Sequence, residues 1–327
     1  MKSAPTPVVS VVVLSHDRPD FLRKVLDSVT AQTYPAVEVL VVDNPSARSP
    51  EIARLVSAYA GARLVRMDEN LGYTGGMNRG LREASGEFVY LTVDDCVPAA
   101  DCVERLVEDA LGHPAEGLLT GLLLHEDRRT ILSAGGEFAL GAVYRRHNLG
   151  AGEGDAGQFK EPFEVSCLDG AMVFGRLDYL RELGGFREEF FIYSDSIELS
   201  ARVLRAGGRV RVVPSARAYV YETPHVFTEA GISFHKMKNL WTMYLLHARW
   251  RVLPEFFLRY ALAVPLRMMW DDRQTTGPLC RAWGWFLRRT PSLVRERRAG
   301  GRPSAIRRGA AGRVGRGDER CLESSLS

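Results

Sequence analysis

The chain has 327 residues, of which 46% are hydrophobic and 25% charged, a composition typical of a globular protein. This length suits one large or two modest domains and excludes a small scaffold held together by disulfides. The formal net charge of +3 hides an asymmetry, because residues 288–320 contain 11 arginines and 3 acids. We therefore expect a slightly acidic folded body and a basic, disordered tail over 288–327.

Five cysteines occur without a CxxC pair and without the spacing of a zinc site. An odd number in a chain of this length favours free thiols in a reducing compartment, and hence a cytoplasmic location. Residues 1–7 contain no apolar run, so no signal peptide is expected. No stretch approaches the ~18 uninterrupted apolar residues of a membrane-spanning helix.

The first 95 residues alternate between predicted strands and helices. Val8–Leu14 is a β-branched run of the kind buried on both faces of a parallel sheet, and Pro19 opens a helix with an apolar stripe. The pattern continues with strands at Val37–Val42, Ala62–Arg66 and Glu87–Val93, and with helices at Pro50–Tyr59 and Gly72–Ala84. Three successive strand–helix units predict right-handed crossovers and a doubly wound sheet.

After a helix predicted at Asp101–Leu111, the pattern becomes mixed. Strands are predicted at Leu118–Leu124, Thr130–Ala134, Phe138–Arg145, Pro162–Cys167, Gly170–Gly175 and Val210–Val213, the last ending at Pro214, and helices at Arg176–Leu183 and Asp195–Ala206. We expect the two halves, 1–100 and 101–232, to form one α/β domain.

Residues 233–287 are rich in large apolar residues, interrupted by arginine or proline every few positions. One interpretation is a helical region that buries its apolar face on the core. The other is a pair of basic, aromatic helices that lie on a membrane surface. Both interpretations fit the same periodicity. For the basic tail, nucleic acid, anionic lipid and no partner at all remain open.

Polar residues follow each predicted parallel strand. They are Ser15, His16 and Asp17 after the first strand, Asp43 and Asn44 after the second, Asn70 and Gly72 after the third, and Asp94 and Asp95 after the fourth. Ligands bind at the carboxyl ends of the strands in an open parallel sheet, so these residues are expected to converge.

Asp94 and Asp95 are the candidate metal ligands. Adjacent carboxylates repel each other and are hard to desolvate together, so the pair calls for a cation or for solvent. Hard oxygen ligands suit Mg²⁺ or Mn²⁺. The alternative is an acidic turn before a helix, whose first turn favours negative charge.

Two further segments carry candidate chemistry. Asn70–Asn78 is a glycine-rich turn into a helix that allows close approach of an anion, although it matches neither common nucleotide-binding glycine motif. Asp195 and Glu198 stand three residues apart at a helix start and hence on one face. Such a carboxylate can act as a general base, and the same spacing fits a helix cap.

Taken in order, these segments resemble a family 2 glycosyltransferase, and among its members the rhamnosyltransferase-like ones most. The resemblance covers about residues 8–239 and is carried by Val11–Ser15, Val41–Asn44, Asn70–Gly80, Asp94-Asp95 with Pro98, Asp169–Met172, Gly184–Phe186 and Phe191–Leu199. It implies a GT-A fold, that is, a Rossmann-like doubly wound sheet with a mixed acceptor-side half and C-terminal helices.

The resemblance also implies roles for individual residues. Nucleotide-sugar binding falls to Ser15, Asp17, Asp43, Asn70, Gly75, Asn78 and Asp94, with Asp43 on the base and Asp94 on the ribose or sugar. Asp95 is implied to ligate Mg²⁺ or Mn²⁺ on the diphosphate, and His225 is the candidate substitute for a family histidine that is missing. Asp195 or Glu198 is implied as the base, because Ser196 replaces the family's second acid there.

The implied reaction moves a sugar, with inversion, from a nucleoside-diphosphate sugar to a hydroxyl of a glycan or lipid-linked acceptor, in cell-surface polysaccharide or glycolipid synthesis. We expect a peripheral membrane contact through 233–320, a location at the inner face of the plasma membrane, and no nucleic-acid partner. Two alternatives remain. One is a nucleotide-sugar-binding protein with impaired catalysis, for which Ser196 argues, and the other is a membrane-associated adaptor.

Overall fold

The computed structural model describes residues 6–113, 117–138, 146–222, 229–271 and 273–299. The described residues divide into two compact units. The first holds those of Met1–Gly136, Asn148–Phe191 and Asp195–Pro224, and the second those of Glu137–His147, Ile192–Ser194 and His225–Ser327. Two short internal segments thus group with the C-terminal helices rather than with the α/β domain expected over 1–232.

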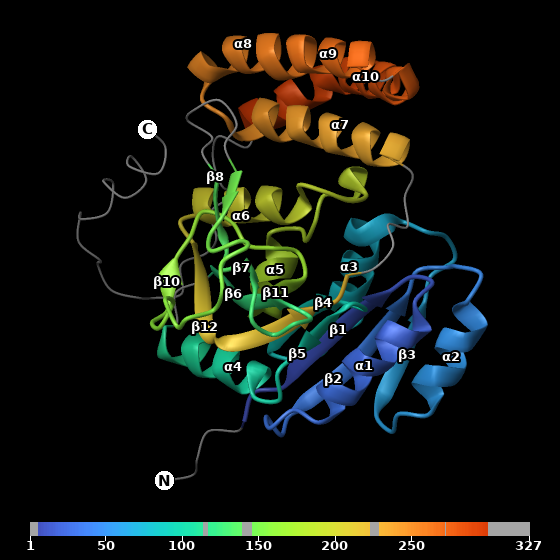
Figure 1. Cartoon of the computed structure of the whole chain (residues 1–327), viewed down its shortest axis with the longest axis vertical. Coiled ribbons are helices and arrows are strands. Elements are labelled where there is room, and N and C mark those ends of the chain that lie inside the picture. The colour runs from blue at the N-terminus through green and yellow to red at the C-terminus, as the bar shows by residue number, and fades with distance from the viewer. Residues whose placement is uncertain (1–5, 114–116, 139–145, 223–228, 272, 300–327) are drawn as a thin grey trace. The chain divides into compact units, whose positions relative to one another are not determined.

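The first unit is built on a ten-stranded mixed sheet (Figure 1). Its parallel part has the order β3-β2-β1-β4, with bounds Val9–Ser15 for β1, Val37–Asp43 for β2, Ala62–Arg66 for β3 and Phe88–Val93 for β4. Every residue of β1 is buried, as its β-branched run predicts for a central parallel strand. The predicted doubly wound arrangement is confirmed.

The sheet continues beyond β4 with strands of both directions. They are β5 (Cys96–Pro98), β6 (Gly117–His125), β7 (Ile131–Ser133), β10 (Phe163–Glu164), β11 (Met172–Arg176) and β12 (Arg209–Val220), while β8 (Gly136–Phe138) and β9 (Arg146–Asn148) form a separate two-stranded sheet. β11 runs antiparallel between β4 and β6, and β12 runs parallel to β6. The predicted mixed half is therefore confirmed.

Two strand predictions were wrong in extent. The strand expected to end before Pro214 continues to Val220, because the register against β6 shifts between Val213 and Arg217 and this irregularity accommodates a residue without an N–H. The strand expected over Pro162–Cys167 is reduced to the two residues of β10. Most of the strand expected at Phe138–Arg145 lies outside the described residues.

Helices cover both faces of the sheet. α1 (Pro19–Thr30), α2 (Ser49–Ser57) and α4 (Cys102–Gly112) share one hydrophobic core with Val11 and Val13 of β1. α3 (Gly72–Glu83) packs on the opposite face, where Gly80 lies against Val12. The remaining helices of this unit are α5 (Leu177–Glu182), the 3₁₀ turn η1 (Glu188–Phe190) and α6 (Asp195–Arg205).

The second unit is helical. It contains α7 (Glu229–His247), η2 (Trp250–Val252), α8 (Leu253–Phe256), the π-helical η3 (Phe257–Ala263), α9 (Val264–Asp271), η4 (Arg273–Thr275) and α10 (Thr276–Ala299). Its own core stacks aromatic rings, for example Tyr244 on Phe256 with centroids 3.6 Å apart. Within the described part of the chain, no helix combines the length and the apolar character needed to cross a membrane.

The basic region expected to form a disordered tail from residue 288 is helical as far as Ala299, because α10 continues to that residue. Its buried residue Leu293 keeps the helix attached to the unit beyond the expected boundary. Residues 300–327 lie outside the described residues.

Candidate active site

The carboxyl ends of β1, β2 and β4 meet at one edge of the sheet. The Ser15 hydroxyl donates to Asp94 Oδ2 over 3.0 Å, and the backbone N–H of His16 donates to the same oxygen over 2.9 Å. The His16 ring lies 3.0 Å from the carbonyl oxygen of Asn44, directly after β2. The convergence predicted for these strand ends is confirmed by these contacts.

Asn44 connects the loop before α3 to the same edge. Its side chain donates to the carbonyl of Gly72 over 3.1 Å and accepts from the N–H of Leu71 over 3.2 Å. Asn70 closes this turn by accepting from the N–H of Gly72 over 2.8 Å. Asn44 stood among the polar residues after the second strand but not among the predicted binding residues. The sequence feature that could have identified Asn44 is its position directly after Asp43.

Asp43 is fully buried at the end of β2. Its Oδ1 accepts a hydrogen bond from Ser49, and Arg66 Nε lies 3.4 Å from Oδ2 in an ion pair. Among the described residues, Oδ2 has no hydrogen-bond partner. Burial raises the pKa of Asp43, and Ser49 and Arg66 oppose this. A buried acceptor that lacks a donor costs free energy, which a donor from a ligand would recover.

Arg18 holds the acidic pair after β4. Its Nη1 lies 2.6 Å from Asp95 Oδ2 and 3.6 Å from Asp94 Oδ1. Sequence reasoning missed Arg18, although it stands between the acid and the proline at the start of α1. Asp17, the preceding residue, is exposed with φ of 64° and accepts from the N–H of Arg48 over 3.2 Å.

The acidic pair has the chemistry of a site for a hard cation. Burial and the neighbouring Asp95 raise the pKa of Asp94 to about 7, so the negative charge here is incompletely compensated. The described residues contain no cluster of three or more His, Cys, Asp or Glu that could enclose a metal. The pair therefore fits a cation that takes one or two carboxylates and completes its shell with phosphate and water. His225 lies outside the described residues.

Asp195 begins α6 close to the turn at Asp169–Ala171. A Cβ on Gly170 would lie 3.6 Å from Asp195 Oδ1, and the Tyr73 hydroxyl of α3 donates to the Gly170 carbonyl over 2.7 Å. Thr92 of β4 donates to the Ala171 carbonyl over 2.9 Å, two positions before Asp94. Burial, reinforced by Asp195, raises the pKa of Tyr73 well above its usual value. This turn links Asp195 to the acidic end of β4.

Glu198, the other candidate base, is used differently. Its two carboxylate oxygens accept from Arg202 Nε over 3.0 and 2.9 Å, and its side chain is almost fully buried. Arg202 also donates to the carbonyl of Leu183 over 2.6 Å and to that of Gly185 over 2.5 Å. Glu198 and Arg202 thus hold the turn after α5 against α6, which is a structural role.

The backbone before Asp195 adopts an unusual conformation. Phe191, Tyr193 and Ser194 have φ of 65°, 71° and 60°, in the left-handed region that such residues seldom adopt. Within the second unit, Asn239 donates to the carbonyls of Ile192 and Tyr193, each over 2.8 Å. Backbone strain of this kind clusters at functional sites, where the surrounding structure maintains it.

Two other predicted binding residues have structural explanations. Gly75 is buried in α3, where a Cβ would lie 2.3 Å from that of Leu71. Asn78 donates to the carbonyl of Phe186 and accepts from its N–H, both over 2.8 Å. Both residues thus maintain the packing of α3 beside the site, and a direct contact with a nucleotide sugar stays a prediction.

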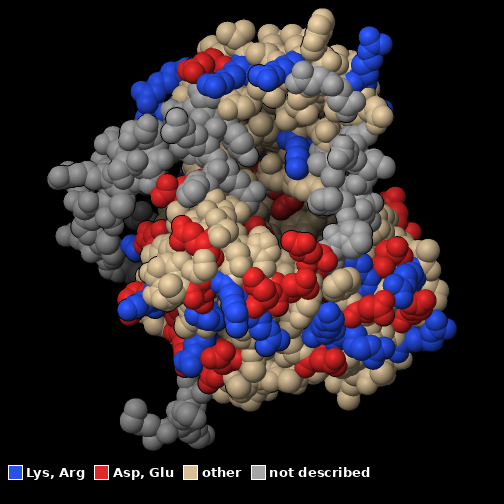
Figure 2. Space-filling model, viewed as in Figure 1, with Lys and Arg blue, Asp and Glu red and all other residues tan. Residues whose placement is uncertain are grey.

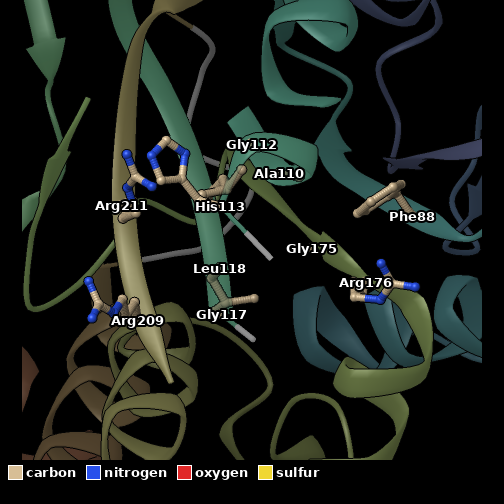
Figure 3. A pocket seen from close by; sticks show the side chains of 11 residues that line it. Phe88, Ala110, Gly112, His113, Gly117, Leu118, Gly175, Arg176, Arg209 and Arg211 are labelled. Atoms are coloured by element: carbon tan, nitrogen blue, oxygen red, sulfur yellow. The ribbon is translucent and has the colours of Figure 1, made fainter. Parts of the chain in front are cut away.

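A cavity of about 360 Å³ lies at the other edge of the same sheet (Figure 3). Its lining includes Phe88, Gly117 and Arg209, the first residues of β4, β6 and β12. Because parallel strands present their carboxyl ends at one edge, this cavity is separate from the cluster around Asp94.

The chain is similar in sequence to several known proteins. The family model for glycosyl transferase family 2 matches residues 10–184. The O-antigen biosynthesis protein RfbC of Myxococcus xanthus is 32% identical over 226 residues, which are 67% of this chain and 18% of that protein. The N-acetylglucosaminyl-diphospho-decaprenol L-rhamnosyltransferase of Mycobacterium tuberculosis is 27% identical over 299 residues, 81% of this chain and 93% of that protein. The chain thus spans about a fifth of the first relative and nearly all of the second.

The fold recurs in solved structures. The crystal structure of GalNAc-T7 with UDP, GalNAc and Mn²⁺ superposes with a TM-score of 0.63 over 89% of this chain and 57% of that chain. The two sequences are 17% identical, so this likeness concerns the fold, which is of the GT-A type.

Proposed function

Because the chain belongs to glycosyl transferase family 2, we propose that it transfers a sugar from a nucleoside-diphosphate sugar to an acceptor hydroxyl with inversion. The observation that carries this proposal is the gathering of Ser15, Asp43 and Asp94 at one sheet edge, with Asp195 linked to it through the turn at Gly170. The relatives named for O-antigen biosynthesis and for rhamnosyl transfer support a role in cell-surface polysaccharide or glycolipid synthesis.

In this proposal Asp43 receives the nucleotide base. Its buried Oδ2 lacks a hydrogen-bond donor in the described structure, and a base N–H would supply one. The side chain of Arg66 is half exposed and its Nε lies 3.4 Å from this oxygen, and we propose that Arg66 moves aside when the base binds. We propose that Ser15, at the end of β1, and Asp17 and Asn70, in the loops after β1 and β3, line the nucleotide pocket together with Asp43.

The diphosphate is proposed to lie at the acidic pair. Asp95 is the residue that would hold Mg²⁺ or Mn²⁺, with Asp94 beside it on the ribose or sugar. When bound, such a cation neutralises the charge that builds on the departing diphosphate. The Arg18 guanidinium now paired with Asp95 matches phosphate oxygens in geometry and charge, so it can exchange one partner for the other when the donor binds.

Asp195 is proposed as the general base. It would accept the proton of the acceptor hydroxyl while that oxygen attacks the anomeric carbon from the face opposite the diphosphate. Glu198 is excluded from this role in our proposal because its carboxylate is engaged by Arg202. Holding donor and acceptor in line supplies much of the rate acceleration.

We extend the proposal to the place of the reaction. A lipid-linked acceptor, of the kind named for the mycobacterial relative, brings the enzyme to a membrane surface, so a peripheral contact is part of the proposal. The described free cysteines include the exposed Cys280, which fits a reducing compartment. We therefore place the enzyme at the cytoplasmic face of the membrane.

The test is sugar transfer by Asp95→Ala during titration with Mn²⁺ or Mg²⁺. We expect a loss on the order of 10²-fold or more in kcat/KM, with the fold preserved, because the ligand of the proposed cation is removed. Asp178→Ala, which removes an exposed carboxylate of α5, is the matched control and should retain activity. Full turnover in Asp95→Ala would reject the assigned role. Donor binding by the parent without any turnover would favour the alternative of a non-catalytic nucleotide-sugar-binding protein.

A further inference from the structure

The second unit carries an unusual amount of exposed apolar surface. The described residues include eight exposed large apolar side chains, and six belong to this unit: Trp250, Leu258, Leu262, Leu266, Trp270 and Leu287. Trp270 is the extreme case, with 88% of its surface exposed. Exposed apolar side chains that adjoin one another mark an interaction site more often than isolated ones do.

Four of these side chains form a regular row along η3 and α9. Leu258, Leu262, Leu266 and Trp270 are spaced by four residues, and we call them the Leu/Trp stripe. In a regular α-helix a spacing of four overshoots a full turn by about 40° at each step. Each π-helical turn of η3 holds more than four residues, so the step from Leu258 to Leu262 covers less than a full turn. This shortfall offsets part of the rotation of about 40° that each later α-helical step adds. The stripe therefore stays on one side of the helix.

Arginines accompany the stripe. Arg259 and Arg267 follow directly after Leu258 and Leu266, and both are exposed. Residues 249–299 contain 11 arginines and no lysine against four acids. Figure 2 shows blue Lys and Arg side chains standing out of a mostly tan surface in the part formed by α8, α9 and α10. The surface is thus both apolar and strongly basic.

We propose that the Leu/Trp stripe, with Arg259 and Arg267, docks on the surface of an anionic lipid bilayer. Leucines at the acyl boundary, a tryptophan at the headgroup level and arginines toward lipid phosphates are the arrangement of a helix lying in the interface. Attraction to an anionic leaflet adds to the burial of apolar surface. The inference names the surface that makes the membrane contact of the proposed function, and it rests on that contact.

A second copy of this chain fits the surface less well. A two-fold contact brings the same patch of both copies together, so the arginines beside the stripe would face each other. Like charges placed opposite one another across an interface are unfavourable. A bilayer with anionic headgroups has the complementary charge instead.

The test is flotation of the full chain with vesicles of phosphatidylcholine and phosphatidylglycerol, in the absence of donor, metal and acceptor. The variant Leu262→Ser/Leu266→Ser/Trp270→Ser should lose partitioning roughly tenfold or more, because each removed side chain is exposed and available to the lipid. Leu111→Ser is the matched control, since Leu111 of α4 is 54% exposed and Leu266 is 55% exposed, and it should float as the parent does. Arg259→Gln/Arg267→Gln should weaken binding to these vesicles and leave binding to pure phosphatidylcholine unchanged.

The outcomes separate this inference from the proposed function. The inference is overturned if the parent does not float, or if the triple variant floats as well as the parent. It is also overturned if sedimentation shows that the triple substitution dissociates a dimer formed without lipid. Sugar transfer to a short, water-soluble acceptor should survive the triple substitution. Loss of flotation with transfer retained supports the docking surface, whereas flotation without transfer in the parent contradicts the proposed function alone.

Discussion

At the residue scale, the folded chain keeps the Asp94 carboxyl protonated at pH values between about 4 and 7, where the unfolded chain has it ionised. Burial and Asp95 raise its pKa from 3.8 to about 7, so the folded chain retains this proton over a range in which the unfolded chain has released it. The contribution of Asp94 to the free energy of unfolding is fully present below about pH 4 and is lost as the pH rises toward 7. Asp94→Asn keeps an oxygen that accepts from Ser15 and removes the charge.

We therefore expect Asp94→Asn to be more stable than the parent at pH 8, by on the order of 4 kcal/mol, and about equal to it at pH 4. Urea unfolding in EDTA at the two pH values measures this difference without interference from bound cations. Asp178→Asn, with an exposed side chain, should change stability little at either pH. Equal stability of parent and Asp94→Asn at pH 8 would contradict the burial argument.

The two acids at the start of α6 should respond differently to isosteric replacement. Asp195→Asn should lower kcat by roughly 10²–10⁴-fold, because it removes a proton acceptor. Glu198→Gln should lower the free energy of unfolding by about 3 kcal/mol, because it leaves Arg202 without its buried counter-charge. Steady-state kinetics combined with thermal unfolding separates these effects. The assignment reverses if Glu198→Gln is the stable, inactive variant.

The sequence predicted where these acids lie, but Glu198 was not recognised as the partner of Arg202. Spacing alone places Asp195 and Glu198 on one face of a helix. Arg202 stands four residues after Glu198 on the predicted helix, so their ion pair could have been predicted from the spacing. The bonds of Arg202 to the carbonyls of Leu183 and Gly185 could not, because only the folded chain brings these groups together. Arg18 was missed for the same reason, because its partner Asp95 lies 77 residues away.

At the element scale, the glycines of α3 are needed because they have no side chain, which allows the helix to pack closely on β1. A Cβ on Gly80 would lie 2.3 Å from Val12 Cγ1 of β1, and one on Gly76 would lie equally close to Leu14. Glycine costs a helix about 1 kcal/mol relative to alanine, so its presence needs such a reason. We expect Gly80→Ala to lower the free energy of unfolding by about 1–3 kcal/mol, because the strand and the helix are forced apart.

The control for that experiment is a helical glycine with space around it. A Cβ on Gly112, the last residue of α4, meets nothing within 4 Å, so Gly112→Ala should be neutral or slightly stabilising. Adding Val12→Ala to Gly80→Ala should recover part of the loss if the clash with that valine is the cause. Chemical denaturation of the parent and the three variants measures both effects. Equal stability of Gly80→Ala and Gly112→Ala would show that α3 tolerates the added methyl group.

Elements were predictable where local pattern and tertiary environment agree. The β-branched run of β1 and the apolar stripe of α1 can be recognised in the sequence, and both are buried in the structure as these patterns predict. β12 was predicted too short because a proline normally ends a strand, whereas the register shift after Val213 lets pairing resume. α10 was predicted too short because its arginines suggested a tail, whereas Leu293 is buried against the unit.

At the scale of the whole molecule, the proposed donor site depends on segments that are far apart in the chain. Ser15 and Asp94 are 79 residues apart in sequence yet share a hydrogen bond. Asp195 stands a further 101 positions along the chain. A ligand that contacts several of these segments binds the folded chain and not the unfolded one. It therefore stabilises the fold by a free energy that grows with the logarithm of the ratio of ligand concentration to Kd.

We expect a nucleoside diphosphate together with Mn²⁺ to raise the melting temperature measurably. At a ligand concentration of 100 times Kd the stabilisation is about 2.7 kcal/mol, which corresponds to roughly 5–10 °C for a unit of this size. Thermal unfolding with UDP, GDP and dTDP, each with Mn²⁺ or with EDTA, measures the shift and ranks the nucleotides. Asp95→Ala should lose the part of the shift in melting temperature that requires Mn²⁺. Asp43→Asn should reduce the differences in shift between UDP, GDP and dTDP. An equal shift in EDTA and in Mn²⁺ would show that the diphosphate is held by Arg18 and the backbone rather than through a cation on Asp95.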